Sequence, residues 1–364
     1  MKKILFITSE SLQDPKRGTP IRILNFIKQL QKAHEVVVSS PAIDQGFSDK
    51  YRAYPSGSVW SKISYFKKII TSEKIEIVLT ATDIDIGLPV WLKFFAGVKI
   101  GMDLHGLYAA EMYFQGHMGC LKSRLLQLKI NFLIRFYDLV FVVSPKLIEY
   151  YGPRLKKGVV IYGGVTEKEF YNGPHNNPPI FTIGYTGNAK PYQGIDYLLN
   201  TAAEIKRKNI FPFRLNMIMS SGRGEIEDTL SRLELTDVAD LHFKASHEEV
   251  PALIASSNVL VIARPSVDMT EYAYPSKLPE YLATGIPVIT TKVGPVEELF
   301  KDEDCIIVIP PVEVEKNLEQ SLLELYQLSQ EDRRAIGQRA IAFVRSRLTW
   351  DILGQTINQS LEQL

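Results

Sequence analysis

The sequence predicts an α/β protein made of two doubly wound domains, each built on a parallel sheet. Short apolar runs alternate with segments whose apolar residues recur at helical spacing, and the same strand–loop–helix opening occurs at residues 4–30 and again at 181–202. Residues 171–179 between them are nearly all turn formers or polar residues, and 364 residues are long for one core. We therefore expect an N-terminal domain at 1–172 and a C-terminal domain at 173–345.

The first domain begins with a buried strand at residues 4–8. A polar loop ending in Gly18-Thr19-Pro20 follows, and apolar residues at helical spacing then predict a helix up to residue 30. Residues 40–60 are rich in proline and glycine and predict a loop. Further strands are expected at 34–39, 75–80, 98–102 and 138–144, and helices at 62–72 and 121–135.

The second domain repeats this opening. A strand at 181–187 leads through a glycine-bearing loop to a helix that begins at residue 195. Further strands are expected at 214–219, 241–243, 258–263 and 288–291, with helices at 248–254, from 277 to 284, at 333–348 and at the end of the chain.

The most informative stretch follows the strand at 258–263. Pro275 and Ser276 predict the start of a helix, because proline is tolerated in a first turn and serine can cap it. Gly285 predicts its end. A helix that starts at the carboxyl end of a parallel strand gathers unpaired backbone N–H groups, which suits a phosphate.

Two charged residues of this helix extend the same interpretation. Lys277 adds a positive charge at the helix start, and Glu280, one turn later, can accept hydrogen bonds from a ribose. On spacing alone, an ordinary strand–helix–strand unit with a surface Lys and a surface Glu explains the stretch equally well.

The residues 275–289, Pro-Ser-Lys-Leu-x-Glu-Tyr-Leu-Ala-x-Gly-x-Pro-Val-Ile, resemble the nucleotide-sugar signature of family 4 retaining glycosyltransferases. The resemblance implies the GT-B fold, in which two Rossmann-like domains face each other across a cleft and a C-terminal helix, here within 346–364, crosses back to the first domain. It also implies that Glu280 holds the donor ribose, and that the helix start and Gly294-Pro295 face the diphosphate. Ser276 and Leu278 belong to the same signature.

The loop after strand 181–187 resembles the donor loop of that family, with two departures. The family often carries Arg after the glycine that matches Gly187 and Lys before the next glycine, and this chain has Asn188 and Gln193 there. The diphosphate would then depend on other cations and on backbone N–H groups. The cations expected to serve are Lys190, Arg264 and Lys277.

A third departure concerns an acid that the family usually places eight residues before the ribose glutamate. That position is Tyr272, and Glu271 precedes it. A loop one residue longer would bring Glu271 to the same place; otherwise the family's first acid is absent. Both alternatives stay open at the level of sequence.

In the first domain, Asp103-Leu104-His105-Gly106 follows the strand at 98–102 and resembles the family's Asp-x-His segment. Loops at this end of a strand build sites in doubly wound sheets. The resemblance implies that His105 faces the donor sugar, where a ring N–H can bond a hydroxyl, and that Gly18 belongs to a glycine loop beside the reaction centre. The catalytic candidates are therefore His105, Glu271 and Lys277.

No metal or other cofactor is expected. Asp83-Ile84-Asp85 has the Asp-x-Asp spacing with which other glycosyltransferases hold a divalent cation, but two acids in three residues arise often by chance. Cys120 and Cys305 lie far apart and form neither a disulfide framework nor a zinc motif. No apolar run is long enough to span a bilayer, and the apolar start is too short for a signal peptide, so we expect a cytoplasmic protein.

Charge is distributed unevenly along the chain. Residues 1–172 carry 24 Lys and Arg against 15 Asp and Glu, whereas residues 173–364 carry 18 against 26. The helix at 121–135 is strongly basic. These features favour an anionic acceptor or peripheral binding at the inner face of a membrane. A core-packing helix with a solvated basic side, on an unevenly charged surface, is the alternative explanation.

We expect a retaining glycosyltransferase of the hexosyltransferase type. It would move a sugar from a nucleoside diphosphate donor to a glycan or lipid-linked acceptor in cell-surface polysaccharide or glycoconjugate synthesis, and no nucleic acid partner is expected. Diphosphate departure needs charge stabilisation more than a protein nucleophile, and the sequence offers glycine loops and cations. Two alternatives are a nucleotide-sugar epimerase of the same fold and a non-catalytic nucleotide-sugar-binding homologue. The departures at Asn188, Gln193 and Tyr272 favour the second.

Overall fold

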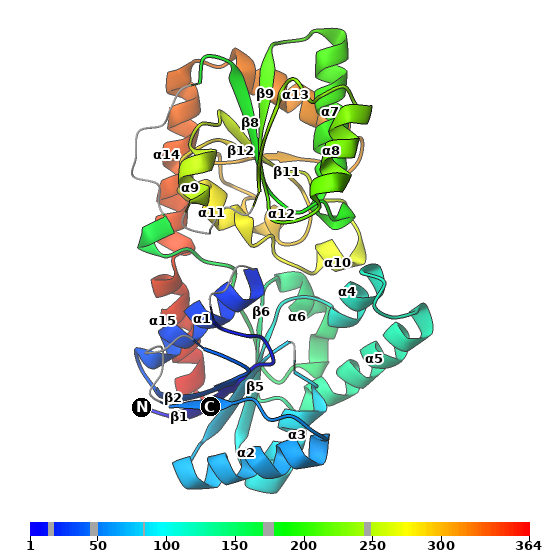
Figure 1. The fold of residues 1–364 in the computed structure, drawn as a ribbon. Helices are drawn as coiled ribbons and strands as arrows, with labels where there is room; N and C mark the ends of the chain where they lie inside the picture. The colour runs from blue at the N-terminus through cyan, green and yellow to red at the C-terminus, as the bar shows by residue number, and fades with distance from the viewer. Residues whose placement is uncertain (14–17, 44–49, 83, 170–177, 244–248) are drawn as a thin grey trace. The chain divides into compact units, whose positions relative to one another are not determined.

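The computed structural model describes residues 1–13, 18–43, 50–82, 84–169, 178–243 and 249–364. Its chain forms two compact units (Figure 1). Unit 1 contains Met1–Gly163, Tyr272–Tyr274 and Trp350–Leu364, and unit 2 contains Gly164–Glu271 and Pro275–Thr349. The expected domain boundaries lay at 172/173 and 345/346. Most of the expected linker at 171–179 lies outside the described residues.

Unit 1 is built on a seven-stranded parallel sheet with the order β3-β2-β1-β4-β5-β6-β7. Its strands are β1 (Lys3–Ile7), β2 (Glu35–Ser40), β3 (Tyr51–Ala53), β4 (Ile77–Ala81), β5 (Lys99–Leu104), β6 (Leu139–Val142) and β7 (Gly158–Val160). Strand β3 lies within residues 40–60, where the sequence indicates a loop-rich stretch and predicts no strand. It is only three residues long and pairs with β2 alone, so it has too few residues to show an alternating pattern.

Helices cover both faces of this sheet. They are α1 (Gly18–Gln31), α2 (Val59–Glu73), α3 (Gly87–Ala96), α4 (Tyr108–Phe114), α5 (Cys120–Leu133), α6 (Pro145–Tyr151) and α15 (Trp350–Glu362), with short 3-10 turns η1 (Ile134–Phe136) and η2 (Gly152–Arg154). Successive residues of β1 point to opposite faces: Leu5 and Ile7 belong to the core beneath α2, α3 and α5, and Ile4 and Phe6 to the core beneath α1 and α15. A strand covered on both faces must be apolar throughout, which explains the continuous apolar runs of the sequence.

The C-terminal helix α15 completes unit 1. Its buried side chains Trp350, Leu353, Ile357 and Leu361 join the same core as the apolar face of α1. Gly354 brings the two helices into close contact, because a Cβ there would lie 2.9 Å from Cβ of Gln29. The expected return of the C-terminal helix to the first domain is confirmed.

Unit 2 is built on a six-stranded parallel sheet with the order β10-β9-β8-β11-β12-β13. Its strands are β8 (Phe181–Gly187), β9 (Phe213–Met219), β10 (Ala239–Phe243), β11 (Val259–Ile262), β12 (Val288–Thr291) and β13 (Ile307–Ile309). Its helices and 3-10 turns are η3 (Glu167–Glu169), η4 (Pro191–Gln193), α7 (Ile195–Lys208), α8 (Arg223–Arg232), α9 (Val250–Ile254), α10 (Asp268–Glu271), α11 (Lys277–Ala283), α12 (Val296–Leu299), α13 (Val314–Gln327) and α14 (Gln330–Arg347).

Two helix pairs pack closely in unit 2, α7 with α13 and α11 with α14. Gly337 in α14 lies directly on the backbone of Gly285. A Cβ added at Gly337 would lie 1.7 Å from the carbonyl oxygen of Gly285. Gly285 itself has φ +73° just beyond the end of α11, as the sequence predicts for a helix stop. The prediction of two doubly wound parallel-sheet domains is confirmed.

Candidate active site

The strand order reverses between β8 and β11 in unit 2. In open parallel sheets, ligands bind beyond the carboxyl ends of the strands at such a point. The loops that leave β8 and β11 there hold most of the donor-binding residues expected from the sequence. The fold therefore brings together segments that lie more than 70 residues apart in the chain.

The loop after β8 is shaped by two glycines. Gly187 has φ +150° and Gly194 has φ +70°, conformations that side chains disfavour. A Cβ at Gly194 would lie 1.7 Å from the carbonyl oxygen of Ala263, so only glycine allows this loop to lie against the end of β11. Between them, the Asn188 carbonyl accepts a hydrogen bond from the Tyr185 hydroxyl at 3.0 Å.

The polar residues of this loop are held mainly by the backbone. The amide oxygen of Asn188 accepts from the backbone N–H of Lys190 at 3.0 Å, and the N–H of Gln193 donates to the Lys190 carbonyl at 2.9 Å. The Lys190 residue is exposed, and Gln193 is partly buried in η4.

Lys277 lies at the carboxyl end of β8. Its ammonium donates to the carbonyl oxygen of Thr186 at 2.9 Å and lies 4.2 Å from the centre of the Tyr185 ring. The hydroxyl of Tyr281, one turn further along α11, accepts from the backbone N–H of Thr186 at 2.6 Å. These bonds attach α11 to the end of β8 and position Lys277 beside Gly187, where a Cβ would lie 3.3 Å from Nζ.

A second cation lies near Lys277. Arg264 follows β11 and is only 7% exposed, and its carbonyl accepts from the Thr291 hydroxyl at 2.7 Å. Burial lowers the pKa of Lys277 to about 7; the positive charge of Arg264 contributes to this shift, and Glu280 opposes it. Burial also lowers the pKa of Arg264 to about 10. Two neighbouring cations withdrawn from water make a favourable position for an anion.

Three other residues of the signature differ in exposure. Ser276 precedes α11, but its side chain makes no capping bond, which corrects the expectation of a serine cap. It adopts helical φ and ψ, whereas a capping serine has an extended backbone. The Leu278 side chain is fully buried and its N–H donates to the Pro275 carbonyl at 2.9 Å, while Glu280 is partly exposed in the first turn.

Glu271 lies among loops of unit 2. One carboxylate oxygen accepts from the Ser266 hydroxyl at 2.6 Å, and the other lies 3.4 Å from the backbone N–H of Gly294. The Tyr272 ring instead packs edge-on against Tyr150 within unit 1. Of the two residues considered for the first-acid position, only Glu271 thus lies in the same unit as Arg264 and Lys277.

In unit 1, His105 belongs to a buried ionic network. Its Nε2 lies 2.7 Å from a carboxylate oxygen of Asp103, and Arg22 donates to both oxygens of that carboxylate, at 2.8 and 2.9 Å. Arg22 also donates to the carbonyls of Ile161 and Tyr162. Burial alone would raise the pKa of Asp103, but Arg22 and His105 outweigh it and hold the pKa well below its usual range.

This network determines which ring nitrogen of His105 is available. An ionised carboxylate only accepts hydrogen bonds, so Nε2 of His105 carries a proton and donates it to Asp103. The Nε2–H of His105 therefore already has a partner in Asp103, and Nδ1 is the ring nitrogen that remains to meet a sugar hydroxyl. In the neutral form of the ring, Nδ1 accepts such a hydrogen bond.

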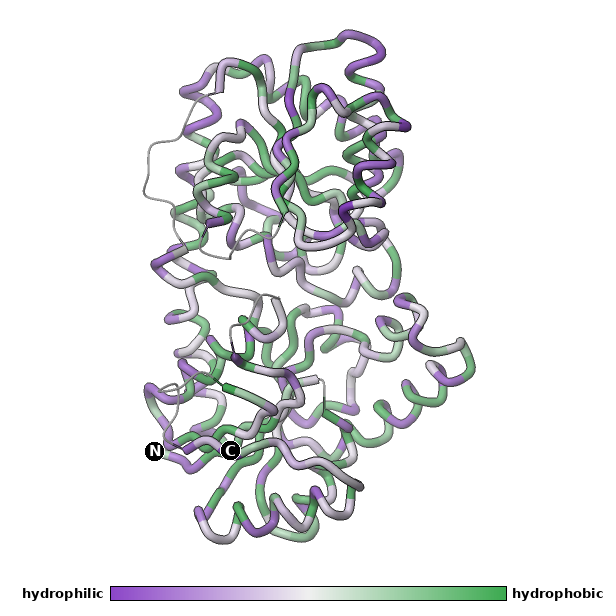
Figure 2. The backbone as a smooth tube through the Cα atoms, viewed as in Figure 1, coloured by the Kyte–Doolittle hydropathy of each residue, from purple (hydrophilic) through white to green (hydrophobic). Residues whose placement is uncertain are grey.

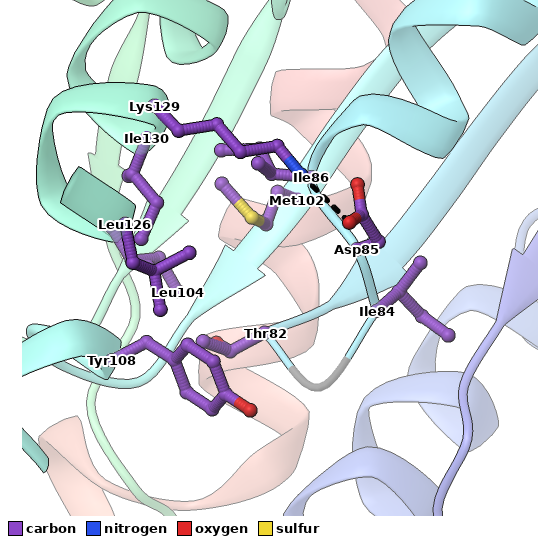
Figure 3. Close-up of a pocket in the computed structure, with 10 residues that line it drawn as sticks. All are labelled: Thr82, Ile84, Asp85, Ile86, Met102, Leu104, Tyr108, Leu126, Lys129 and Ile130. Atoms are coloured by element: carbon purple, nitrogen blue, oxygen red, sulfur yellow. Dashed lines mark hydrogen bonds and ion pairs between the residues drawn. The ribbon is translucent and has the colours of Figure 1, made fainter. Parts of the chain in front are cut away.

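A cavity of about 230 Å³ lies beside this network in unit 1 (Figure 3). Most of its wall is apolar, and Asp85 and Lys129 form an ion pair of 2.7 Å within it. Thr82 also lines the cavity. Its hydroxyl accepts a hydrogen bond from the backbone N–H of His105 and donates one to the backbone carbonyl of Asp103. The other lining residues are Ile84, Ile86, Met102, Leu104, Tyr108, Leu126 and Ile130.

Several residues that the sequence analysis named lie apart from the groups around Lys277 and His105, or outside the residues that the structure describes. Gly18 is the exposed first residue of α1, and the preceding Arg17 lies outside the described residues. Asp83 also lies outside them. The paired carboxylates of Asp83-Ile84-Asp85 therefore cannot be compared in space, and Asp85 is held by Lys129 and by the Gly87 N–H.

Sequence reasoning missed two residues near His105. Arg22 lies 81 positions before Asp103, and no local pattern connects them. Glu111 in α4 is partly buried, which raises the pKa of its carboxyl, and the field of His105 opposes that shift. An acid six residues after His105 is a signal that the sequence did offer.

Residues 180–328 match the family model described as glycosyl transferases group 1. This match covers the β8 loop, Arg264, Lys277 and Glu280. No curated protein sequence matches the chain.

Among solved structures, the chain is similar over its whole length to sucrose-phosphate synthase from Thermosynechococcus elongatus. The TM-score is 0.79 at 16% identity, and the likeness covers 100% of this chain and 99% of the other. HepE from Anabaena in complex with UDP and glucose gives a TM-score of 0.76 at 16% identity, with 100% of both chains covered. WaaB, a lipopolysaccharide outer core galactosyltransferase, gives a TM-score of 0.69 at 14% identity, with 99% of each chain covered.

These likenesses identify the fold, and the matched domain identifies the class of enzyme. The chain is a GT-B glycosyltransferase. The matched segment of this glycosyltransferase lies in unit 2, except for residues 272–274.

Proposed function

We propose that this glycosyltransferase belongs to family 4 and transfers a hexose with retention of configuration from a nucleoside diphosphate sugar. The neighbouring cations Arg264, which is buried, and Lys277, which is partly buried, carry the proposal, because they lie together at the carboxyl ends of β8 and β11 and the charge of Arg264 adds to the effect of burial in lowering the pKa of Lys277. A diphosphate placed there would relieve the repulsion between the two cations. The solved complexes of HepE with UDP and with UDP-glucose support a donor of this class.

The proposed reaction needs no protein nucleophile. The bond between the anomeric carbon and the diphosphate oxygen breaks, and its electron pair remains on the phosphate. The acceptor hydroxyl attacks on the same face and gives its proton to the departing phosphate oxygen. Lys277, Arg264 and backbone N–H groups stabilise the negative charge that develops on that oxygen. The proposal assigns no metal ion to this step.

Further residues receive roles within the same proposal. Glu280 accepts from the donor ribose, Glu271 supports the loops that carry Gly294 and Arg264, and Nδ1 of His105 accepts from a hydroxyl of the transferred sugar. Gly187, Asn188, Lys190, Gln193 and Ser276 form the donor loops. The apolar cavity of unit 1 fits an acceptor with an apolar portion, such as a lipid-linked sugar in cell-surface glycan synthesis.

A panel of nucleotide sugars tests the proposal directly. We expect one donor to yield a free nucleoside diphosphate, by transfer or by slow hydrolysis. Appearance of an epimeric nucleotide sugar would instead identify an epimerase, and binding without any change would identify a non-catalytic homologue.

The role of Glu280 is tested with the nucleoside diphosphate of that donor. Glu280→Ala removes a charge-assisted hydrogen bond worth about 1.5–3 kcal/mol, so the dissociation constant should rise roughly ten- to a hundredfold. Titration calorimetry measures this change, and circular dichroism checks that the variant folds. Unchanged affinity would remove Glu280 from the donor site.

A further inference from the structure

Helix α5 has apolar residues on two opposite faces. Leu126, Ile130 and Leu133 pack inward on the core of unit 1. A second stripe at Leu121, Leu125, Leu128 and Phe132 lies outward, with exposures of 71%, 58%, 64% and 59%. Hydrophobic residues accordingly recur along this helix in Figure 2. A helix that is apolar on both sides is usually covered on both sides.

The outer stripe continues onto neighbouring helices. The Phe136 ring lies 5.8 Å from Phe132 and 5.6 Å from Phe94 of α3, which is 60% exposed. Further along α3, the exposed rings of Trp91 and Phe95 stack at 5.7 Å. Trp60 of α2, 63% exposed, completes the group at 5.8 Å from Trp91. We call this surface, from Trp60 through α3 to Leu121, the apolar patch.

The apolar patch lies among positive charges. Helix α5 and η1 carry Lys122, Arg124, Lys129 and Arg135 and no acidic residue. Helices α2 and α3 carry four lysines, at 62, 67, 68 and 93, against one acid, Glu73. Two of the counted lysines are paired with acids, Lys93 with Asp138 and Lys129 with Asp85. Glu73 itself is bonded to Arg52.

A hollow beside η1 has the same charge. Arg135, Arg154 and Lys156 line it together with Pro153, and its volume is about 390 Å³. Lys156 is paired with Asp138 at 3.2 Å, and Arg135 and Arg154 add two further cations, which suit a phosphate group.

We propose that the apolar patch docks unit 1 on an anionic phospholipid bilayer. The leucines and aromatic rings enter the interface, the surrounding lysines and arginines contact lipid phosphates, and the hollow at Arg135 holds one headgroup. A second copy of the chain is a poorer occupant, because a symmetric contact would bring two cationic surfaces together. No helix among the described residues is long and apolar enough to cross a membrane, so docking of this kind is peripheral.

The inference does not depend on which sugar is transferred, because docking is measured without substrate. The full chain is sedimented with vesicles of phosphatidylcholine alone and of phosphatidylcholine with phosphatidylglycerol, at low and high salt. We expect binding to the anionic vesicles that weakens with salt, and little binding to the neutral ones.

Leu125→Gln with Leu128→Gln tests the apolar stripe. Both side chains are exposed and line no site, so the thermal unfolding midpoint and donor hydrolysis should stay unchanged, while vesicle affinity should fall about tenfold or more. Val312→Gln is the matched control, since Val312 is an exposed aliphatic residue of unit 2. Arg135→Gln with Lys156→Gln should lower the affinity and flatten its salt dependence.

Three results would overturn the proposal. The first is the absence of binding to anionic vesicles at low salt, and the second is equal binding by the stripe variant and wild type. The third is a wild-type dimer in light scattering that the stripe variant converts to a monomer without any vesicle binding, which would make the patch an interface between copies.

Discussion

At the scale of single residues, the site depends on charged groups withdrawn from water. The pKa of Lys277 is lowered because burial and Arg264 both disfavour its ammonium form, with burial the larger cause. The pKa of Asp103 is lowered for the opposite reason, since the charge of Arg22 and the hydrogen bonds from Arg22 and His105 outweigh burial. In both cases the charge state follows from neighbours that lie far away in the sequence.

Lys277 should take up a proton when a diphosphate binds. At pH 8 a lysine with a pKa of about 7 is mostly neutral, and a phosphate favours the ammonium form, so binding should take up close to one proton at pH 8 and almost none at pH 6. Calorimetry of nucleoside diphosphate binding in buffers of different ionisation enthalpy measures this number. Lys277→Met should abolish the uptake. Lys190→Met, an exposed lysine of the β8 loop, should preserve it. Uptake that persists in Lys277→Met would assign the proton elsewhere.

Arg22→Gln should destabilise unit 1 strongly. The substitution removes the positive charge beside the buried Asp103 carboxylate and leaves it the ring N–H of His105, at a cost of about 3–5 kcal/mol at neutral pH. Because the pKa of Asp103 is depressed in the folded state, the loss in free energy of unfolding caused by the substitution should be complete above pH ~4. It should shrink as the pH falls further. Urea unfolding followed by tryptophan fluorescence measures it, since all three tryptophans belong to unit 1.

The control for this substitution is Arg223→Gln. Arg223 forms an exposed pair with Glu227 in α8 and lies 3.9 Å from the centre of the Phe243 ring, so its removal should cost at most about 2 kcal/mol, read from circular dichroism because α8 belongs to unit 2. Equal costs for the two variants would show that the Arg22–Asp103 pair contributes no more than a surface pair.

At the scale of elements, glycines determine how closely helices and loops approach. Gly194 allows the β8 loop to lie against the end of β11, and Gly337 allows α14 to lie on the backbone after α11. Both contacts support the segments that carry Lys190, Arg264 and Lys277. Packing at these glycines therefore supports the proposed donor site, to which the glycines contribute no polar side chain.

Gly337→Ala should destabilise unit 2, although alanine is the better helix former. A Cβ would lie 1.7 Å from the Gly285 carbonyl oxygen, so α14 must move, at about 1–3 kcal/mol or more. Gly224→Ala in α8 is the matched control, because no atom lies within 4 Å of the added carbon and the change should stabilise by up to about 1 kcal/mol. Thermal melting followed by circular dichroism compares the two. Equal melting temperatures would mean that α14 shifts without cost.

At the scale of the whole molecule, the chain returns to its first unit at the end. Ile357 is fully buried in α15 and belongs to the same core as Phe26 of α1, more than 300 positions earlier. The C-terminal helix is therefore a structural part of unit 1, although it follows the last helix of unit 2 directly in sequence.

Ile357→Ala should weaken unit 1 and leave unit 2 unchanged. Loss of a buried isoleucine side chain costs about 2–5 kcal/mol. Hydrogen exchange should show faster exchange in β1, β2 and α1, with unchanged protection in β8, β9 and β11. Faster exchange confined to unit 2 would contradict the assignment of α15.

Much of the fold could be predicted from sequence because the relevant signals are local. Apolar runs locate strands such as β8 and β11, helical spacing locates α7, and Gly285 marks the end of α11. Local spacing also placed Lys277 and Glu280 in the first turn of a helix. The short strand β3 escaped prediction, since three residues beside a loop carry too little pattern.

By itself, the sequence determined the two-domain α/β class, the order of its elements and the signature around Lys277, all of which follow from periodicity over a few residues. Only the tertiary structure decided what those elements bring together. It joined Arg22 to Asp103 across 81 positions, directed Nε2 of His105 to that carboxylate, and left one apolar face of α5 uncovered. Spacing along one helix identifies apolar faces, but burial depends on distant segments that local sequence does not specify.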